Sequence, residues 1–395
     1  MPNLLTFLIV LFAIAALLRI DFFFNILYLL FAVYLLSRLW MRRVTANVRA
    51  ERRFVNRAFP GDEVRVELRV SNAGWLPAPW LEVRESLPVE LASPPFHHVV
   101  LSLGPHETRR LHYRLRCRRR GYYPIGPLTL RTGDLFGVHE HTRQADETAY
   151  LIVYPEVVAL EALGLPTHSP FPAIRARSPL FEDPARIMGV RDYQIGDSPR
   201  RIHWTSTAAA GRLLVKQYEP AIARDTLICL DLDTATYEMR HRYTAPELAI
   251  KVAASVANHI IVREGLPAGL VTTAWDPLAE EQARVSLPPR SERAHLMSIL
   301  EILARVQLTH EPAPFADLMR RESANLTWGT TIVAVTGREN PALFDVLAYL
   351  KRAGFVVSLM LISPAAPSPE MEGRAQVLNI PVHRIWSEEA LEMVA

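Results

Sequence analysis

The sequence has little cysteine and none of the common catalytic signatures. Its 395 residues include only two cysteines, Cys117 and Cys229, and these lack the spacing of a metal site. That excludes a secreted disulfide scaffold, and both thiols are expected to be small core hydrophobes. A Walker motif, a zinc-binding spacing and a GxSxG nucleophile elbow are also missing. The formal net charge of +3 is close to balance, so we expect no nucleic-acid partner.

Two apolar runs open the chain. Leu4–Leu18 is interrupted only by Thr6, and Phe22–Leu36 carries Asn25 as its one strongly polar residue. Each run reaches the length of a membrane-spanning helix, about twenty residues, when its flanks are counted. A signal peptide is disfavoured because no basic residue precedes the first run and the second run follows at once. The sequence therefore predicts a transmembrane hairpin over residues 1–43, with the lipid bilayer as a partner.

Arginines set the expected orientation of this hairpin. No Lys or Arg precedes the first run, whereas six arginines follow the second: Arg38, Arg42, Arg43, Arg49, Arg52 and Arg53. Cytoplasmic flanks of membrane helices are enriched in Lys and Arg. We therefore expect a multi-pass protein of the inner membrane whose soluble domains lie in the cytoplasm.

Residues 44–160 have the pattern of an all-β domain. Apolar residues occupy every second position at Val64, Val66, Leu68 and Val70, with charged residues between them. This alternation is typical of strands with one solvated face. Turn signals recur at Pro60-Gly61, Gly104-Pro105 and Gly126-Pro127. The spacing predicts a sandwich of immunoglobulin-like type.

A proline-rich stretch follows this domain, within residues 161–222. Prolines hold a chain extended and keep it out of helices and central strands, so residues 161 to about 187 are expected to be a linker. A short run rich in Arg, Asp, Tyr, His and Trp then occupies residues 189–204. Its side chains are costly to order unless they share a hydrogen-bonded arrangement.

Strands and helices alternate over residues 223–395. Strands are expected at residues 226–232, 268–274, 331–336, 355–362 and 382–386, and helices at residues 291–306 and 341–352. A further helix is expected to open at a capping box, Thr244–Glu247. The alternation predicts a mostly parallel sheet covered on both faces, which binds ligands at the carboxyl ends of its strands.

The first of these strands ends in two carboxylates, Asp231 and Asp233. Three interpretations stay open. The loop resembles the metal-ion-dependent adhesion motif Asp-x-Ser-x-Ser of von Willebrand factor A domains, although Asp233 and Ala235 stand at the serine positions. It also resembles the phosphatase motif Asp-x-Asp-x-Thr of haloacid dehalogenases, although Ala235 replaces the threonine. The third interpretation is a polar strand end without metal. The first makes Asp231 and Asp233 candidate ligands of Mg²⁺.

The run at residues 189–204 carries a family resemblance. Its positions follow the order Arg191, Tyr193, Gly196, Asp197, Arg200 or Arg201, Ile202 and Trp204. This pattern is similar to the signature of domain-of-unknown-function family 58. The resemblance implies a membrane hairpin, a β domain and a von Willebrand factor A-like domain in a bacterial or archaeal protein. It also implies a partner, because relatives are typically encoded beside MoxR-type AAA+ ATPases.

The signature residues have a plausible physical arrangement. Asp197 can accept hydrogen bonds from Arg200 or Arg201, and Gly196 permits a turn closed to other residues. Tyr193 and Trp204 are expected to bury their rings. The structural interpretation is a clamp between the linker and the α/β domain, and the functional one is a docking surface or ligand pocket. His203 titrates near neutral pH in ordinary surroundings, but no nucleophile pattern accompanies it.

The sequence therefore predicts a multidomain protein with an N-terminal helical hairpin, a sandwich and a Rossmann-type domain. We expect a non-enzymatic, membrane-anchored interaction or scaffold protein that works with a MoxR-type ATPase in chaperone-like assembly. A phosphatase using Asp231 and Asp233 is the first alternative. A cell-surface adhesin, which requires the opposite membrane orientation, is the second.

Overall fold

The computed structural model describes residues 10, 12–13, 21–91, 96–134, 140–160, 182–194, 199–220, 225–310, 314–364 and 368–386. The chain divides into two compact units, Met1–Glu156 and Val157–Ala395. The boundary falls four residues before the end predicted for the β domain.

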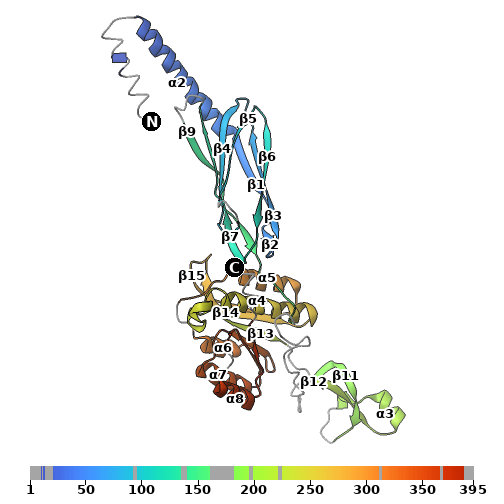
Figure 1. Cartoon of the computed structure of the whole chain (residues 1–395). Coiled ribbons are helices and arrows are strands. Elements are labelled where there is room, and N and C mark those ends of the chain that lie inside the picture. Colours follow the sequence, from blue (N-terminus) through green and yellow to red (C-terminus); the bar gives the residue numbers. More distant parts are fainter. Residues whose placement is uncertain are drawn as a thin grey trace. The chain divides into compact units, whose positions relative to one another are not determined.

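Helix α2, Asp21–Asn47, opens the described part of the first unit. It contains the second predicted apolar span and continues four residues beyond residue 43. Only 11% of its most apolar window is buried, and Figure 1 shows it projecting from the strands. The first predicted span, residues 4–18, lies almost wholly outside the described residues. One other described helix, Ala245–Arg263, is also long and apolar enough to cross a membrane, but 72% of it is buried, as in a core helix.

The last turns of α2 pack against the sandwich. Met41 and Val44 are buried, and Val44 packs in the sandwich core. The indole Nε1 of Trp40 donates to the carbonyl of Pro77 at 3.1 Å, and the hydroxyl of Ser37 donates to Asp134. No loop separates α2 from the first strand, which begins at Val48. The helix is therefore held to the sandwich by packing and hydrogen bonds.

In the residues that the structure describes, ten strands form the β part of this unit. One sheet has the order β1-β3-β6, another β5-β4-β8-β9, and a third β2-β10-β7. In the first sheet the strands are β1 (Val48–Arg53), β3 (Glu63–Asn72) and β6 (Thr108–Arg116). In the second they are β4 (Ala78–Ser86), β5 (Phe96–Leu103), β8 (Leu128–Gly133) and β9 (Glu140–Asp146). In the third they are β2 (Arg57–Ala58), β7 (Gly121–Ile125) and β10 (Ala149–Val153).

The inward faces of these sheets share one core. Strand β3 alternates buried and exposed side chains as predicted, with Val66, Leu68 and Val70 fully buried. A buried ion pair crosses the core, because Arg52 of β1 donates to Glu85 of β4 and both side chains are at most 1% exposed. The hydroxyl of Tyr113 on β6 donates to the same carboxylate. The predicted β sandwich is thus present.

A six-stranded sheet forms the centre of the second unit, in the order β15-β14-β13-β16-β17-β18. Its strands are β13 (Thr226–Asp231), β14 (Ala268–Asp276), β15 (Glu281–Arg290), β16 (Thr331–Thr336), β17 (Val356–Leu361) and β18 (Val382–Arg384). Strand β15 is antiparallel to β14, and all other pairs are parallel. Each predicted strand is found, whereas β15 was not anticipated. Its two prolines, Pro288 and Pro289, are tolerated because it is an edge strand.

Helices cover both faces of this sheet (Figure 1). They are α4 (Ala245–Asn258), α5 (Arg293–Arg305), α6 (Phe315–Ser323), α7 (Pro341–Arg352) and α8 (Pro369–Val377). Strands β13 and β17 are buried at every position, as expected for a parallel sheet between two helical layers. The predicted capping box is wrong, because Thr244 has helical backbone angles and its side chain makes no capping hydrogen bond. A proline in the first turn pre-organises the start of α4 instead.

The signature segment forms a small element within the second unit. Strand β11 (Glu182–Asp192) pairs antiparallel with β12 (Leu214–Pro220), and helix α3 (Trp204–Ala210) lies between them in the chain. The predicted linker is therefore wrong from Glu182 onward, since this stretch is a strand. Most of the predicted linker, residues 161–181, lies outside the described residues.

Candidate functional site

Two groups of residues singled out by the sequence are candidate sites, and the signature segment is the first. Its backbone closes on itself: the amide of Tyr193 donates to Leu213 O at 3.0 Å, and that of His203 donates to Leu214 O at 2.9 Å. The chain thus leaves β11, turns through α3 and returns to β12 over a short hydrogen-bonded path. Ile202 is buried and forms an isolated bridge with Val215.

His203 has a structural role in this segment. Its ring Nδ1 accepts a hydrogen bond from the amide of Ser206 at 3.2 Å, and its carbonyl accepts one from Thr207 at 2.9 Å. The imidazole therefore caps the N-terminus of α3. At the other end Gly211 has φ +65°, the left-handed conformation that ends many helices.

Trp204 contradicts the sequence prediction. Its side chain was expected to be buried, but it is 68% exposed. The reason is local: α3 has only seven residues and none of them is buried, so its first residue has no core to enter. Tyr193, by contrast, is half-buried. An exposed tryptophan is costly in water and typical of the surfaces that bind other proteins.

The remaining signature residues are only partly described. Arg191 and Arg201 are half-buried, and the Nη1 of Arg191 donates to Asp192 O at 3.1 Å. Gly196, Asp197 and the side chain of Arg200 lie outside the described residues. The predicted hydrogen bonds between Asp197 and the arginines stay predictions.

The acidic loop at the end of β13 is the second candidate site. Strands β13 and β16 are parallel neighbours, with Leu230 opposite Val335, so their carboxyl ends meet at one edge of the sheet. There the hydroxyl of Thr336 donates to Asp231 Oδ2 at 2.8 Å. The other carboxylate oxygen, Oδ1, accepts from the amide of Asp233 at 3.1 Å. Both oxygens of Asp231 are therefore hydrogen-bonded, and the residue is only 3% exposed.

Asp233 holds the loop that follows. Its Oδ1 accepts from the amide of Ala235 at 2.9 Å and so caps a 3-10 turn, Thr234–Thr236. The hydroxyl of Thr236 donates to the carbonyl of Asp233 at 2.7 Å. The hydroxyl of Tyr237 donates to the carbonyl of Asp231 at 2.6 Å. Side chains of this loop are thus used to fix its own backbone.

Burial dominates the electrostatics of this loop. It raises the pKa of Asp231 from its ordinary value of 3.8 to about 6, against the opposing effect of the hydrogen bonds from Thr336 and from the Asp233 amide. Burial also raises the pKa of Tyr237 well above its usual value. Ionised Asp231 is therefore destabilised in its buried position.

The side chains at this loop do not provide a suitable set of ligands for a resident Mg²⁺ ion. Magnesium requires near-octahedral oxygen ligands, usually with several waters. Both oxygens of Asp231 already accept hydrogen bonds, Asp233 caps a turn, and Ala235 supplies no ligand. In the described part of the chain, no three His, Cys, Asp or Glu side chains come close enough together to hold a metal ion.

A cleft of about 440 Å³ opens beside this loop. It is lined from the end of β13 by Thr236, Tyr237 and Glu238, and from the end of β16 by Gly337, Arg338 and Glu339. The second group carries no recognisable motif, but polar residues directly after a buried strand are a usable signal for it. A methyl group on Gly337 would lie 2.4 Å from ring carbon Cδ1 of Tyr237, so the close approach of the two loops requires glycine.

The comparisons with known proteins agree with the signature. Residues 189–324 match the family described as Protein of unknown function DUF58. The uncharacterized protein YeaD of Bacillus subtilis (strain 168) is 26% identical over 161 residues, which are 40% of this chain and 38% of that protein. The chain therefore matches less than half the length of this relative.

Several solved structures match about a quarter of the chain. The CARDB domain of the PF1109 protein from Pyrococcus furiosus matches with 20% identity and a TM-score of 0.22, over 27% of this chain and 91% of that domain. The alkylpurine DNA glycosylase AlkC of Pseudomonas fluorescens matches with 10% identity and a TM-score of 0.18, over 27% of this chain and 30% of that chain. Such scores carry no argument about function. The resemblance read from the signature is confirmed over residues 189–324, which carry the segment of the DUF58 family.

Proposed function

We propose that this chain is a membrane-anchored interaction protein whose α/β domain is of the von Willebrand factor A-like type. The strand order supports this assignment, because β14 and β16 flank β13 and the chain reverses its direction of winding there. Ligands of open α/β sheets bind outside the carboxyl ends of the strands at such a point. The cleft beside Thr236 and Arg338 lies at this edge.

The state of the acidic loop is the observation that carries the proposal. A phosphatase needs a carboxylate free to attack a phosphorus atom and a second group to transfer the proton. Asp231 is buried with both oxygens hydrogen-bonded, and Asp233 caps a turn. These side chains shape a binding surface. We expect the purified chain to leave a generic phosphate ester unhydrolysed, and hydrolysis abolished by Asp231→Asn would contradict the proposal.

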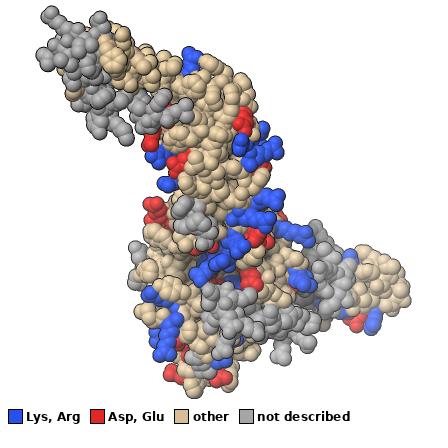
Figure 2. Space-filling view, turned by 45° about the horizontal axis from the view of Figure 1, so that its top comes forward, with Lys and Arg blue, Asp and Glu red and all other residues tan. Residues whose placement is uncertain are grey.

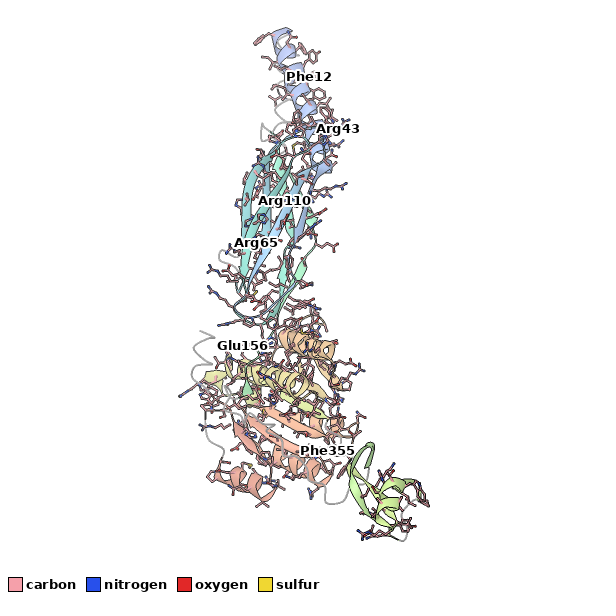
Figure 3. All side chains as sticks on the ribbon, turned by 90° about the vertical axis from the view of Figure 1, so that its right-hand side faces the viewer. Phe12, Arg43, Arg65, Arg110, Glu156 and Phe355 are labelled. Atoms are coloured by element: carbon pink, nitrogen blue, oxygen red, sulfur yellow. The ribbon has the colours of Figure 1, made fainter. Side chains whose placement is uncertain are left out.

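The surface of α2 supports the membrane anchor. Large apolar side chains cover it, and they are about half to two-thirds exposed at Phe22, Tyr28, Leu29, Phe31, Leu35 and Leu36. The part of α2 ahead of the turns that pack on the sandwich, residues 21–36, is about 24 Å long at 1.5 Å per residue, which covers most of a bilayer core of about 30 Å. In Figure 2 the visible surface of α2 is largely uncharged. Figure 3 shows Arg43 at the junction with the sandwich, and Arg65 and Arg110 farther along the strands.

The orientation of the anchor separates the proposal from the adhesin alternative. Both native cysteines are buried, so a single new cysteine on the sandwich can report accessibility. We choose Val89→Cys, since Val89 is 71% exposed. A membrane-impermeant maleimide should label this variant in permeabilised cells and leave it unlabelled in intact spheroplasts. Labelling in intact spheroplasts would place the sandwich outside and favour the adhesin.

The partner we propose is a MoxR-type AAA+ ATPase, in chaperone-like assembly at the membrane. The exposed Trp204 supports a protein contact through the signature segment. The test is co-purification of the detergent-solubilised full chain with such an ATPase, with nucleotide and Mg²⁺ present. Trp204→Ala should reduce the recovered ATPase severalfold, whereas Trp75→Ala, which removes an equally exposed tryptophan from the sandwich, should not. Failure of the wild-type chain to retain the ATPase would refute the partnership.

A further inference from the structure

The acidic side chains around the cleft are engaged in contacts within their own domain. Asp231 and Asp233 hold their own loop, as described above. Glu339 accepts from the amide of Ser368 at 2.7 Å. Glu238 lies 3.6 Å from the Nδ1 of His241. Asp231, Asp233 and Glu339 are thus hydrogen-bonded within the domain, and Glu238 lies near an imidazole.

The guanidinium groups are the unmatched ones. Arg338 lines the cleft and is exposed, and Arg240, two residues after the cleft residue Glu238, is exposed as well. Among the residues that the structure describes, neither side chain makes a hydrogen bond or an ion pair. A guanidinium presents five donors in a planar fork that fits a carboxylate with two parallel hydrogen bonds. The fork of Arg338 lines the cleft where the fold places its ligands, and that of Arg240 is two residues along the chain from the cleft residue Glu238.

Large exposed side chains lie near Arg240 in the chain. Met239 is 77% exposed and Tyr243 is 71% exposed, and both lie on the segment between β13 and α4. Arg242 stacks on the ring of Tyr243, with its Cζ 4.6 Å from the ring centroid, and holds that ring in place. Tyrosine, methionine and arginine are the residues enriched at the centres of protein interfaces. The combination is unlike a site for a small polar metabolite.

We propose that the cleft with Arg338, together with the exposed segment that continues from its residue Glu238 through Met239, Arg240 and Tyr243, binds an acidic segment of a partner protein. A partner carboxylate would receive the fork of Arg338, and neighbouring apolar side chains of the segment would cover Met239 and Tyr243. The proposal rests on the interaction function proposed above and names the chemistry of the partner. A nucleic-acid strand is disfavoured, because Glu238 and Glu339 interrupt the basic side chains that a row of phosphates would need.

Binding of fluorescein-labelled hexaglutamate to the full chain in uncharged detergent tests this proposal. Fluorescence anisotropy should show binding of hexaglutamate and none of hexalysine. Arg338→Glu and Arg240→Glu should each weaken binding by about tenfold or more, the effect of losing a charge-assisted hydrogen bond. Arg321→Glu is the matched control, because Arg321 is an exposed arginine on α6 of the same domain. It should change affinity by no more than about twofold.

Three results would overturn the proposal: no binding of hexaglutamate by the wild-type chain, equal binding by the Arg338→Glu variant, or displacement of hexaglutamate by a thymidine oligonucleotide. Amide exchange of β13 should be unchanged in each variant, which shows that the domain is folded. If a charge reversal unfolds the domain, the milder variant Arg338→Gln is tested for hexaglutamate binding in its place. Retained co-purification of the ATPase without hexaglutamate binding would reject this site and leave the proposed function standing.

Discussion

Asp231→Asn should stabilise the α/β domain at neutral pH, and the effect should vanish in acid. Burial raises the pKa of Asp231 from 3.8 to about 6, so between these two values the folded protein keeps a proton that the unfolded chain has lost. The free energy of unfolding therefore falls as the pH rises through this window. Above it the ionised carboxylate costs up to about 3 kcal/mol, at about 1.4 kcal/mol for each pKa unit.

An asparagine avoids this cost and keeps the hydrogen bonds. Its Oδ1 accepts from the amide of Asp233, and its Nδ2 donates to the hydroxyl oxygen of Thr336. That hydroxyl then has the carbonyl of Arg338 as an acceptor, 3.4 Å away. We expect a net gain of about 1–3 kcal/mol at pH 7, since repacking takes back part of the electrostatic gain.

Hydrogen exchange of the β13 peptide, measured by mass spectrometry on the full chain, reports the local free energy of unfolding. Comparing variant with wild type at each pH cancels the intrinsic exchange rate. The variant should exchange about tenfold more slowly or better at pH 7 and equally at pH 4. Asp233→Asn is the control, because asparagine caps a turn as aspartate does, and it should keep the wild-type pH profile. A variant that exchanges faster at pH 7, or by a factor independent of pH, would refute the argument.

Further predictions concern packing elsewhere. Gly337→Ala places a methyl 2.4 Å from the Tyr237 ring and should destabilise the α/β domain by about 1–3 kcal/mol in β13 exchange; an unchanged rate would show that the loops are free to separate. Arg52→Met should cost the sandwich about 3–5 kcal/mol by leaving Glu85 charged and buried, and adding Glu85→Leu should recover most of it; equal losses in the single and double variants would argue against the ion pair. Burial raises the pKa of the Cys229 thiol, so a thiol reagent should modify it only after unfolding, and rapid labelling of the folded chain would contradict its buried position.

Local patterns predicted the elements of this fold well. Period-two alternation around Val66 identified a strand with one buried face, and short apolar runs identified β13, β16 and β17. These features depend only on neighbouring residues, which is why the sequence displays them. Strand β15 escaped because its prolines argue against a strand, and only its position at the sheet edge makes them tolerable.

The candidate site was harder to predict because its contacts are long-range. Asp231 and Asp233 were recognised as a pair, yet their state depends on Thr336, which lies 105 residues farther along the chain. The burial predicted for Trp204 was wrong for a different reason. Its size predicts burial, but a helix of seven residues between two strands provides no core for it. The tendency of a residue type to be buried depends on its own side chain, whereas the burial of a particular residue depends on the surface against which it packs.

The contrast between Asp231 and Arg338 favours the proposed binding function over catalysis at this edge. A catalytic carboxylate must reach its substrate, and burial with hydrogen bonds to both oxygens makes a carboxylate less accessible. Asp231 has those hydrogen bonds, whereas Arg338 beside it is exposed in the cleft. A fold that buries its carboxylate and presents a guanidinium at the same edge is equipped to hold an anionic group. A reactive Asp231, together with an Arg338 that can be replaced without loss of any interaction, would contradict a binding role for this edge.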